Sequence, residues 1–108
     1  MALDFTALDS AMVGAGEKLG GTIWNDMQLF AIPELKKITT QILAIEEHKA
    51  DFTPEGAQAL LDMQIRATIG IIVGMTTLTL LAVQAAINEI LAAVKGMVNA
   101  AIGFALIP

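Results

Sequence analysis

Residues 67–88 form a run without a single charged side chain, and this run limits the folds open to the chain more than any other feature. Beyond residue 66 the only charged residues are Glu89 and Lys95. A helix rises 1.5 Å per residue, so a helix over 67–88 would be about 30 Å long, which matches the hydrocarbon core of a bilayer. We therefore expect this segment to lie in lipid or to be buried by copies of the same chain.

The composition separates the chain into two parts. Hydrophobic residues make up 56% of the 108 residues, and the mean hydropathy is +0.68. Ten of the eleven acidic residues and five of the six basic residues precede residue 67. The net charge of −5 argues against a nucleic-acid binder, which needs a basic surface to displace phosphate counterions. The chain has no cysteine, which excludes disulfides and thiolate chemistry.

The N-terminal part predicts short amphipathic helices. A helix can begin after Asp4, and a glycine-rich loop up to residue 21 should follow it. Thr22 is a plausible N-cap for a second helix, which Pro33 is expected to kink or restart. Apolar residues then recur at helical spacing, so the helix is expected to continue to about 48–50; they are Leu35, Ile38, Ile42 and Ile45.

The segment 51–56 predicts a turn followed by a helix start. Thr53 suits the N-cap, Pro54 the first helical position, and Glu55 the positive end of the helix dipole. From this start we expect one long helix towards Ile102, bent at Gly96. A hairpin that turns within 84–89 is the second choice, because no glycine or proline marks a turn there.

These elements predict an all-α fold. It is a helical hairpin in which a short amphipathic N-terminal helical region is followed by one long apolar C-terminal helix, embedded in a membrane or buried in an oligomer. The first region covers 1–53 and the second 54–108, with a candidate transmembrane span at 67–88.

At 100° per residue, eight polar residues of the expected long helix fall within one arc of roughly 140°. These residues are Gln58, Asp62, Arg66, Thr77, Gln84, Asn88, Lys95 and Asn99. Small residues that suit close helix–helix packing lie on or beside this arc, and they include a GxxxG spacing. The packing residues are Gly70, Gly74, Ala85, Ala92 and Gly96. The polar stripe is expected to line water or a subunit contact, although tolerated polar residues of a core helix would give the same pattern.

The sequence offers little catalytic equipment. His48, the only histidine, lies near Glu47 and Asp51, whose i, i+4 spacing suits a divalent cation in principle. A solvated acidic helix end explains this group better. Ser10 is the only serine, and no triad can be assigned to it from the sequence. We therefore expect no enzyme, no cofactor and no metal.

Three classes of function fit these features. The first is a non-enzymatic structural subunit of a homo-oligomeric helical assembly, such as a virion component, a pilus-like filament or a secretion channel. The second is a membrane-permeabilising pore former, holin-like or toxin-like. The third is a soluble helical hairpin that a partner protein buries.

The expected partners are copies of the chain itself and lipid. The expected location is a membrane or a membrane-associated assembly, in a virion or a cell envelope. Because Asp4 is an early acid and no basic residue precedes Lys18, no cleavable secretory signal is expected.

Overall fold

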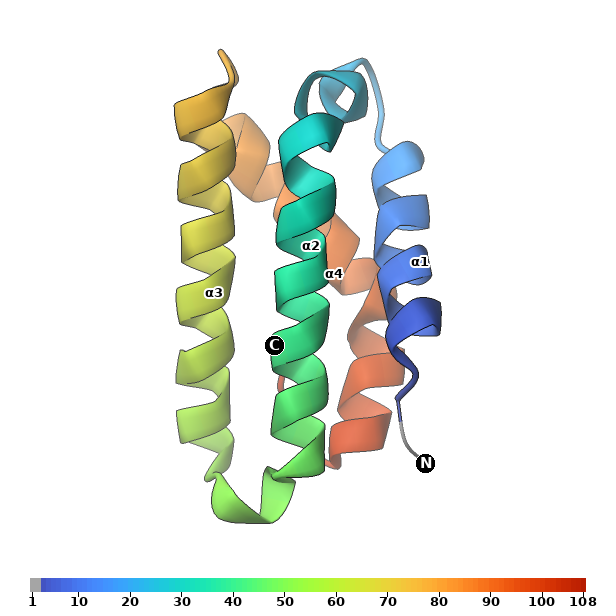
Figure 1. Cartoon of the computed structure of the whole chain (residues 1–108), viewed down its shortest axis with the longest axis vertical. Helices are drawn as coiled ribbons and strands as arrows, with labels where there is room; N and C mark the ends of the chain where they lie inside the picture. Colours follow the sequence, from blue (N-terminus) through green and yellow to red (C-terminus); the bar gives the residue numbers. More distant parts are fainter. Residues whose placement is uncertain (1–2) are drawn as a thin grey trace.

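A computed structural model describes residues 3–108, and these residues form four α-helices (Figure 1). Helices α1, α2 and α3 stand side by side, and α4 crosses behind them on a diagonal (Figure 1). Successive helices run in alternating directions, and a final segment turns back towards the middle of the bundle (Figure 1). The helices are α1 (Phe5–Glu17), α2 (Ile23–Glu47), α3 (Pro54–Met75) and α4 (Leu80–Ile102), with a 3₁₀ turn at Lys49–Asp51.

Helix α1 begins as the sequence predicts. The Asp4 carboxylate accepts a hydrogen bond from the Ala7 backbone N–H at 2.9 Å and so satisfies one of the free donors of the first turn. Leu8, Met12 and Gly16 recur every four residues and form the buried face. The bare Cα of Gly16 lets the ring of Trp24 from α2 lie directly against α1.

Helix α2 carries the predicted apolar stripe, and its four members at 35, 38, 42 and 45 are all fully buried. The helix ends at Glu47, close to the predicted end. The expected kink or restart at Pro33 does not divide it, because α2 continues as one element from Ile23 to Glu47. Thr22 makes no side-chain cap to the backbone, and its hydroxyl lies 3.5 Å from an Asp26 carboxylate oxygen instead.

The predicted start of α3 is confirmed. The Thr53 hydroxyl accepts a hydrogen bond from the Gly56 N–H at 3.0 Å, and Pro54 occupies the first helical turn. The boundary between 53 and 54 therefore falls at a turn within one bundle. Helices on either side of this boundary pack against each other, because α2 contacts α3 and α1 contacts α4.

The expectation of one long helix from Pro54 to about Ile102 is wrong. Helix α3 ends at Met75 and α4 begins at Leu80, so the candidate span 67–88 is interrupted by residues 76–79. Threonine side chains explain the break. The Thr76 hydroxyl donates to the Ile72 carbonyl at 2.7 Å and accepts from the Leu78 N–H, and Thr79 caps α4 through the Ala82 N–H at 3.2 Å.

The all-α prediction is confirmed, and the chain does have a long apolar C-terminal helix, α4. The chain turns between α3 and α4 at 76–79, rather than at 84–89 as the second choice had it. Helix α4 continues through Gly96 as one element and ends at Ile102, with Gly103 at its C-cap. Gly103 has a φ of 94°, in the left-handed region that glycine adopts without strain.

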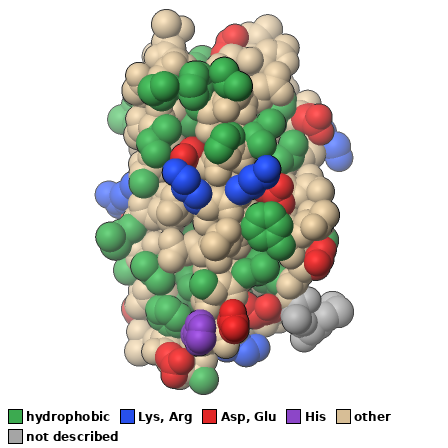
Figure 2. Space-filling view, in the orientation of Figure 1, with side chains coloured by type: hydrophobic (Ala, Val, Ile, Leu, Met, Phe, Trp, Pro, Cys, Tyr) green, Lys and Arg blue, Asp and Glu red, His purple; other side chains and the backbone are tan. Residues whose placement is uncertain are grey.

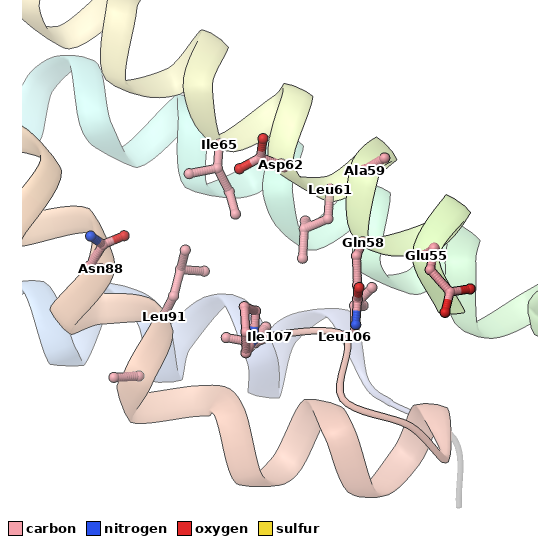
Figure 3. A pocket seen from close by; sticks show the side chains of 12 residues that line it. Glu55, Gln58, Ala59, Leu61, Asp62, Ile65, Asn88, Leu91, Leu106 and Ile107 are labelled. Carbon is pink, nitrogen blue, oxygen red and sulfur yellow. The ribbon is translucent and has the colours of Figure 1, made fainter. Parts of the chain in front are cut away.

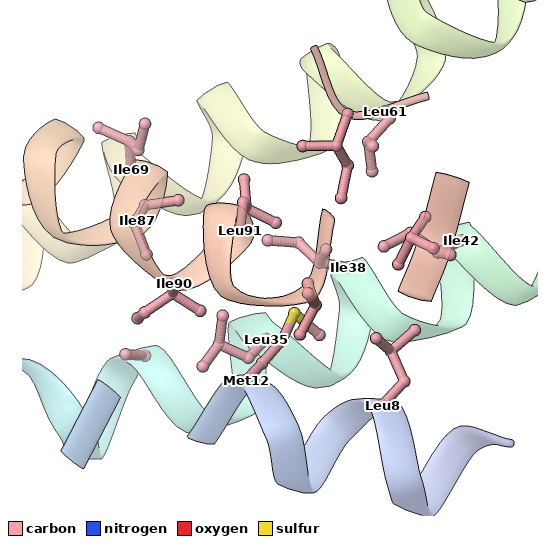
Figure 4. Close-up of a cluster of buried hydrophobic side chains, with 14 of the residues drawn as sticks. Leu8, Met12, Leu35, Ile38, Ile42, Leu61, Ile69, Ile87, Ile90 and Leu91 are labelled. Atoms are coloured by element: carbon pink, nitrogen blue, oxygen red, sulfur yellow. The ribbon is translucent and has the colours of Figure 1, made fainter. Parts of the chain in front are cut away.

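The core lies where the four helices meet. Figure 4 shows Met12 of α1 beside Leu35 and Ile38 of α2 and Leu8 of α1 directed towards Ile42, with Ile90 of α4 closing the cluster. The hairpin of α3 and α4 thus supplies apolar side chains to the same core as the N-terminal helices. Burial of large aliphatic side chains, at roughly 1.5–3 kcal/mol each, is the main favourable term that closes the bundle.

Candidate functional site

The break at 76–79 divides the predicted polar stripe between α3, the turn and α4. Asp62 and Arg66 lie exposed on α3, where the Arg66 Nε and an Asp62 oxygen are 2.7 Å apart. Thr77 is exposed in the turn. On α4, Asn88 and Lys95 are exposed, whereas Gln84 and Asn99 are partly buried. The stripe is therefore not one continuous face of one helix.

Folding back brings some members of the stripe together around a cavity of about 520 Å³ between α3, α4 and the C-terminal segment. Gln58 and Asp62 reach it from α3, and Asn88 from α4 (Figure 3). Glu55, which the stripe did not include, also lines the cavity. Glu55 lies seven residues before Asp62 and therefore on the same face of α3, but this spacing alone does not indicate a cavity.

The walls of this cavity are apolar. Leu61 and Ile65 of α3 lie opposite Leu91 of α4, and Leu106 and Ile107 of the C-terminal segment form a further wall (Figure 3). Leu106 is only 1% exposed and Ile107 only 5% exposed, so both belong to the core. The last apolar residues of the chain therefore lie inside the bundle between α3 and α4.

Two side chains hold the C-terminal segment in place, and a third contacts the end of α4. The Asn99 amide donates to the Ile107 carbonyl at 2.8 Å and accepts from the Ile107 N–H at 2.9 Å. The Gln58 amide donates to the Ala105 carbonyl at 2.6 Å. The Lys49 ammonium donates to the Ala101 carbonyl at 3.3 Å, at the end of α4. Two predicted stripe residues thus make contacts within the chain that the sequence did not indicate.

The predicted packing residues lie on the outside of the bundle. Gly70, Gly74, Ala85, Ala92 and Gly96 are all exposed. A Cβ atom added at Gly70, Gly74 or Gly96 would meet nothing within 4 Å in the described part of the chain. These small residues therefore do not serve packing between the helices of one copy, and their surface stays open to another molecule.

Large apolar side chains gather beside these glycines, at the end of the bundle where α3 turns into α4. Four of them, Ile71, Met75, Leu80 and Leu81, are 40–78% exposed, and together we call them the apolar tip. Met63 continues the exposed apolar face along α3. Figure 2 shows hydrophobic side chains over the upper part of one face, the end that holds this turn, while the charged ones lie mostly lower.

Of the acidic residues around His48, Glu46 binds the backbone of Leu3. Both carboxylate oxygens of Glu46 accept from the Leu3 N–H, at 3.1 and 2.9 Å. His48 Nδ1 lies 3.9 Å from an Asp51 oxygen, and both side chains are largely exposed. Within residues 3–108 no group of three acidic or histidine side chains is arranged to hold a metal ion.

Helix α4 is, among the described residues, the one helix long and apolar enough to cross a membrane, with a mean hydropathy of 1.4. In the bundle, 39% of its most apolar window is buried. No family model, no curated protein and no solved structure matches the chain. The fold and the site therefore define the protein as an all-α four-helix bundle with an exposed apolar tip and a half-open cavity between α3, α4 and the C-terminal segment.

Proposed function

We propose that the protein is a non-enzymatic structural subunit that assembles with copies of itself through the outer face of α3 and the apolar tip. The observation that carries this proposal is the exposure of the apolar tip next to open glycine positions. Soluble monomers rarely leave large apolar side chains together on one surface, because each costs free energy in water. A second copy would remove these side chains from water.

The glycines add a geometric reason. Gly70 and Gly74 are four residues apart on the exposed face of α3, so they lie one above the other on the helix surface. A partner helix can approach the backbone closely at such positions and gain van der Waals contact along its length. Met63 and Ile71 flank this track, and each is more than a third exposed. A virion component, a pilus-like filament or a secretion channel would each use such a repeated contact.

Single-cysteine cross-linking tests the proposal, because the native chain contains no cysteine. Ala67 is exposed on the proposed face of α3, and Ala44 is exposed on α2. We expect Ala67→Cys to give disulfide-linked dimers under mild oxidation, and the matched variant Ala44→Cys to give few. Light scattering of the native chain should show a mass above that of one 11.4 kDa chain.

The proposal fails if the native chain remains monomeric at high micromolar concentration and both cysteine variants cross-link equally poorly. A replacement of Leu81, the most exposed large apolar residue, gives a second measurement. Leu81→Glu should dissolve the assembly and leave the helical circular dichroism unchanged, since this side chain is 78% exposed and adds little to the core.

Helix α4 favours a second candidate, a membrane-permeabilising protein. Its length and hydropathy suffice for a span, and its apolar N-terminal end lies at the exposed tip. In this alternative the α3–α4 hairpin enters the bilayer tip first, and Gln84 and Asn88 face the water of a pore. Dye release from liposomes separates the two candidates, because an assembly subunit alone leaves the vesicles intact.

A further inference from the structure

The cavity between α3, α4 and the C-terminal segment has the size of a small-molecule site. Its volume of about 520 Å³ lies within the range of roughly 300–1,000 Å³ that ligand pockets occupy. Leu61, Ile65 and Leu91 form its apolar walls, together with Leu106 and Ile107. An apolar chain would therefore lose its hydration on entering the cavity, with a gain proportional to the area removed from water.

The polar side chains at the rim of the cavity differ in how many of their hydrogen-bonding groups are already used within the chain. Gln58 donates one amide N–H to the Ala105 carbonyl, which leaves its amide oxygen as an acceptor and its second N–H as a donor. An Asp62 oxygen is held by Arg66 at 2.7 Å. Glu55 forms no ion pair with any residue of 3–108, and its carboxylate oxygens can accept hydrogen bonds.

The charge at the rim therefore favours a cation. Both ionisable residues that line the cavity, Glu55 and Asp62, are acidic, and no lysine or arginine lines the described part of the cavity. Arg66 pairs with Asp62, which leaves Glu55, in the first turn of α3, as the rim carboxylate without an ion-pair partner among residues 3–108. A ligand that matches this site has an apolar body and a positively charged hydrogen-bond donor at one end.

We propose that this cavity binds an aliphatic amine, with its hydrocarbon chain along Ala59, Ile65 and Ala92 and its ammonium group at Glu55. The buried side chains of Leu61, Leu91 and Leu106 form the floor beneath the chain. The apolar walls supply affinity, and the carboxylate supplies the preference for a cation over an anion. The C-terminal segment forms part of the site, so the same contacts that fix Leu106 and Ile107 also shape the binding cavity. This site is separate from the apolar tip and does not depend on assembly.

The test uses the full-length protein and three probes of equal chain length: octylammonium, octanol and octanoate, each below its micelle-forming concentration. Isothermal titration should give a dissociation constant below about 1 mM for octylammonium. Octanoate should bind at least tenfold more weakly, because its carboxylate meets an acidic rim. In ¹⁵N–¹H spectra, the saturable shifts should fall on the amides of Leu61 and Ile107.

Two matched pairs of variants locate the binding. Ala92 lines the cavity and the neighbouring Ala93 does not, although both are exposed on α4. Ala92→Phe should abolish octylammonium binding, whereas Ala93→Phe should leave it unchanged. Glu55→Gln should weaken octylammonium about fivefold without affecting octanol, and the remote exposed change Glu47→Gln should affect neither.

Three results would overturn the proposal. The first is equal binding of octanoate and octylammonium, which would remove the role of Glu55. The second is unchanged binding in a folded Ala92→Phe variant, which would place the ligand elsewhere. The third is a set of shifts confined to the apolar tip, which would show adsorption of the alkyl chain to the exposed surface of α3 and α4.

Discussion

Replacing Gly16 by alanine tests the contact between α1 and α2 most directly. A Cβ atom at this position would lie 2.4, 2.5 and 2.8 Å from three ring atoms of Trp24, far inside ordinary van der Waals contact. Trp24 is only 7% exposed, and its rigid ring cannot move without disturbing the core. Overpacking of this kind costs typically about 1–3 kcal/mol.

Gly14 provides the internal control. It lies in the same helix, and a Cβ atom there would meet nothing within 4 Å. Alanine is favoured over glycine in a helix by about 0.8–1 kcal/mol, so Gly14→Ala should raise the free energy of unfolding by up to that amount. Gly16→Ala also gains part of this helix propensity, but its added methyl group clashes with the Trp24 ring. The difference between the two variants isolates the clash, which we place at about 2–3 kcal/mol because the ring is rigid.

Urea denaturation followed by circular dichroism measures both changes, at a protein concentration low enough to keep the oligomeric state constant. The expected shifts have opposite signs. In a Trp24→Leu background the cost of Gly16→Ala should largely disappear, as a double-mutant cycle would show. If Gly16→Ala were as stable as Gly14→Ala, the close packing of Trp24 on α1 would be refuted.

Three further predictions concern the C-terminal half. Leu106→Ala should lower the free energy of unfolding by about 2–4 kcal/mol by chemical denaturation, because the side chain is 1% exposed, while a change at the exposed Ala105 should have little effect. Thr79→Ala should cost about 1 kcal/mol in the same assay, because it removes the N-cap of α4. Spin labels at Met63 and Met97 should lie clearly less than about 50 Å apart by pulsed electron resonance, because α4 folds back against α3; one continuous helix would separate the two backbone positions by about 50 Å.

The sequence predicted those elements whose cause is local. The Thr53–Pro54 start of α3 depends on residues that are neighbours in the chain, and the structure shows the predicted cap. The apolar stripe of α2 depends only on helical spacing, and all its members are buried. In both cases the neighbouring residues alone contain the physical reason.

The turn at 76–79 was missed because its own residues favour a turn only weakly. Most of the stabilisation comes from contacts between α4 and distant parts of the chain. Three threonines in four residues offer side-chain bonds that compete with the helix, but glycine and proline are the stronger markers of a turn. The larger gain comes from folding α4 back onto the other helices, which buries residues such as Ile87 and Ile90. The hydrophobic periodicity of one segment gives no information about this burial between helices.

The change in composition at residue 66 acquires a physical meaning in the fold. The first half of α3 carries Glu55, Gln58 and Asp62 and borders the cavity, whereas its second half carries Ile71 and Met75 and ends in the apolar tip. Residues 67–88 therefore form the part of the α3–α4 pair whose exposed side chains are mostly apolar. The acidic residues of α3, Glu55 and Asp62, lie on the part of this helix that borders the cavity rim. Because the two surfaces occupy different turns of the same helix, the contact between copies and the binding of a cationic ligand need not compete. A long apolar run, which first suggests a bilayer span, is thus also explained by a hairpin with one side in the core and an exposed tip.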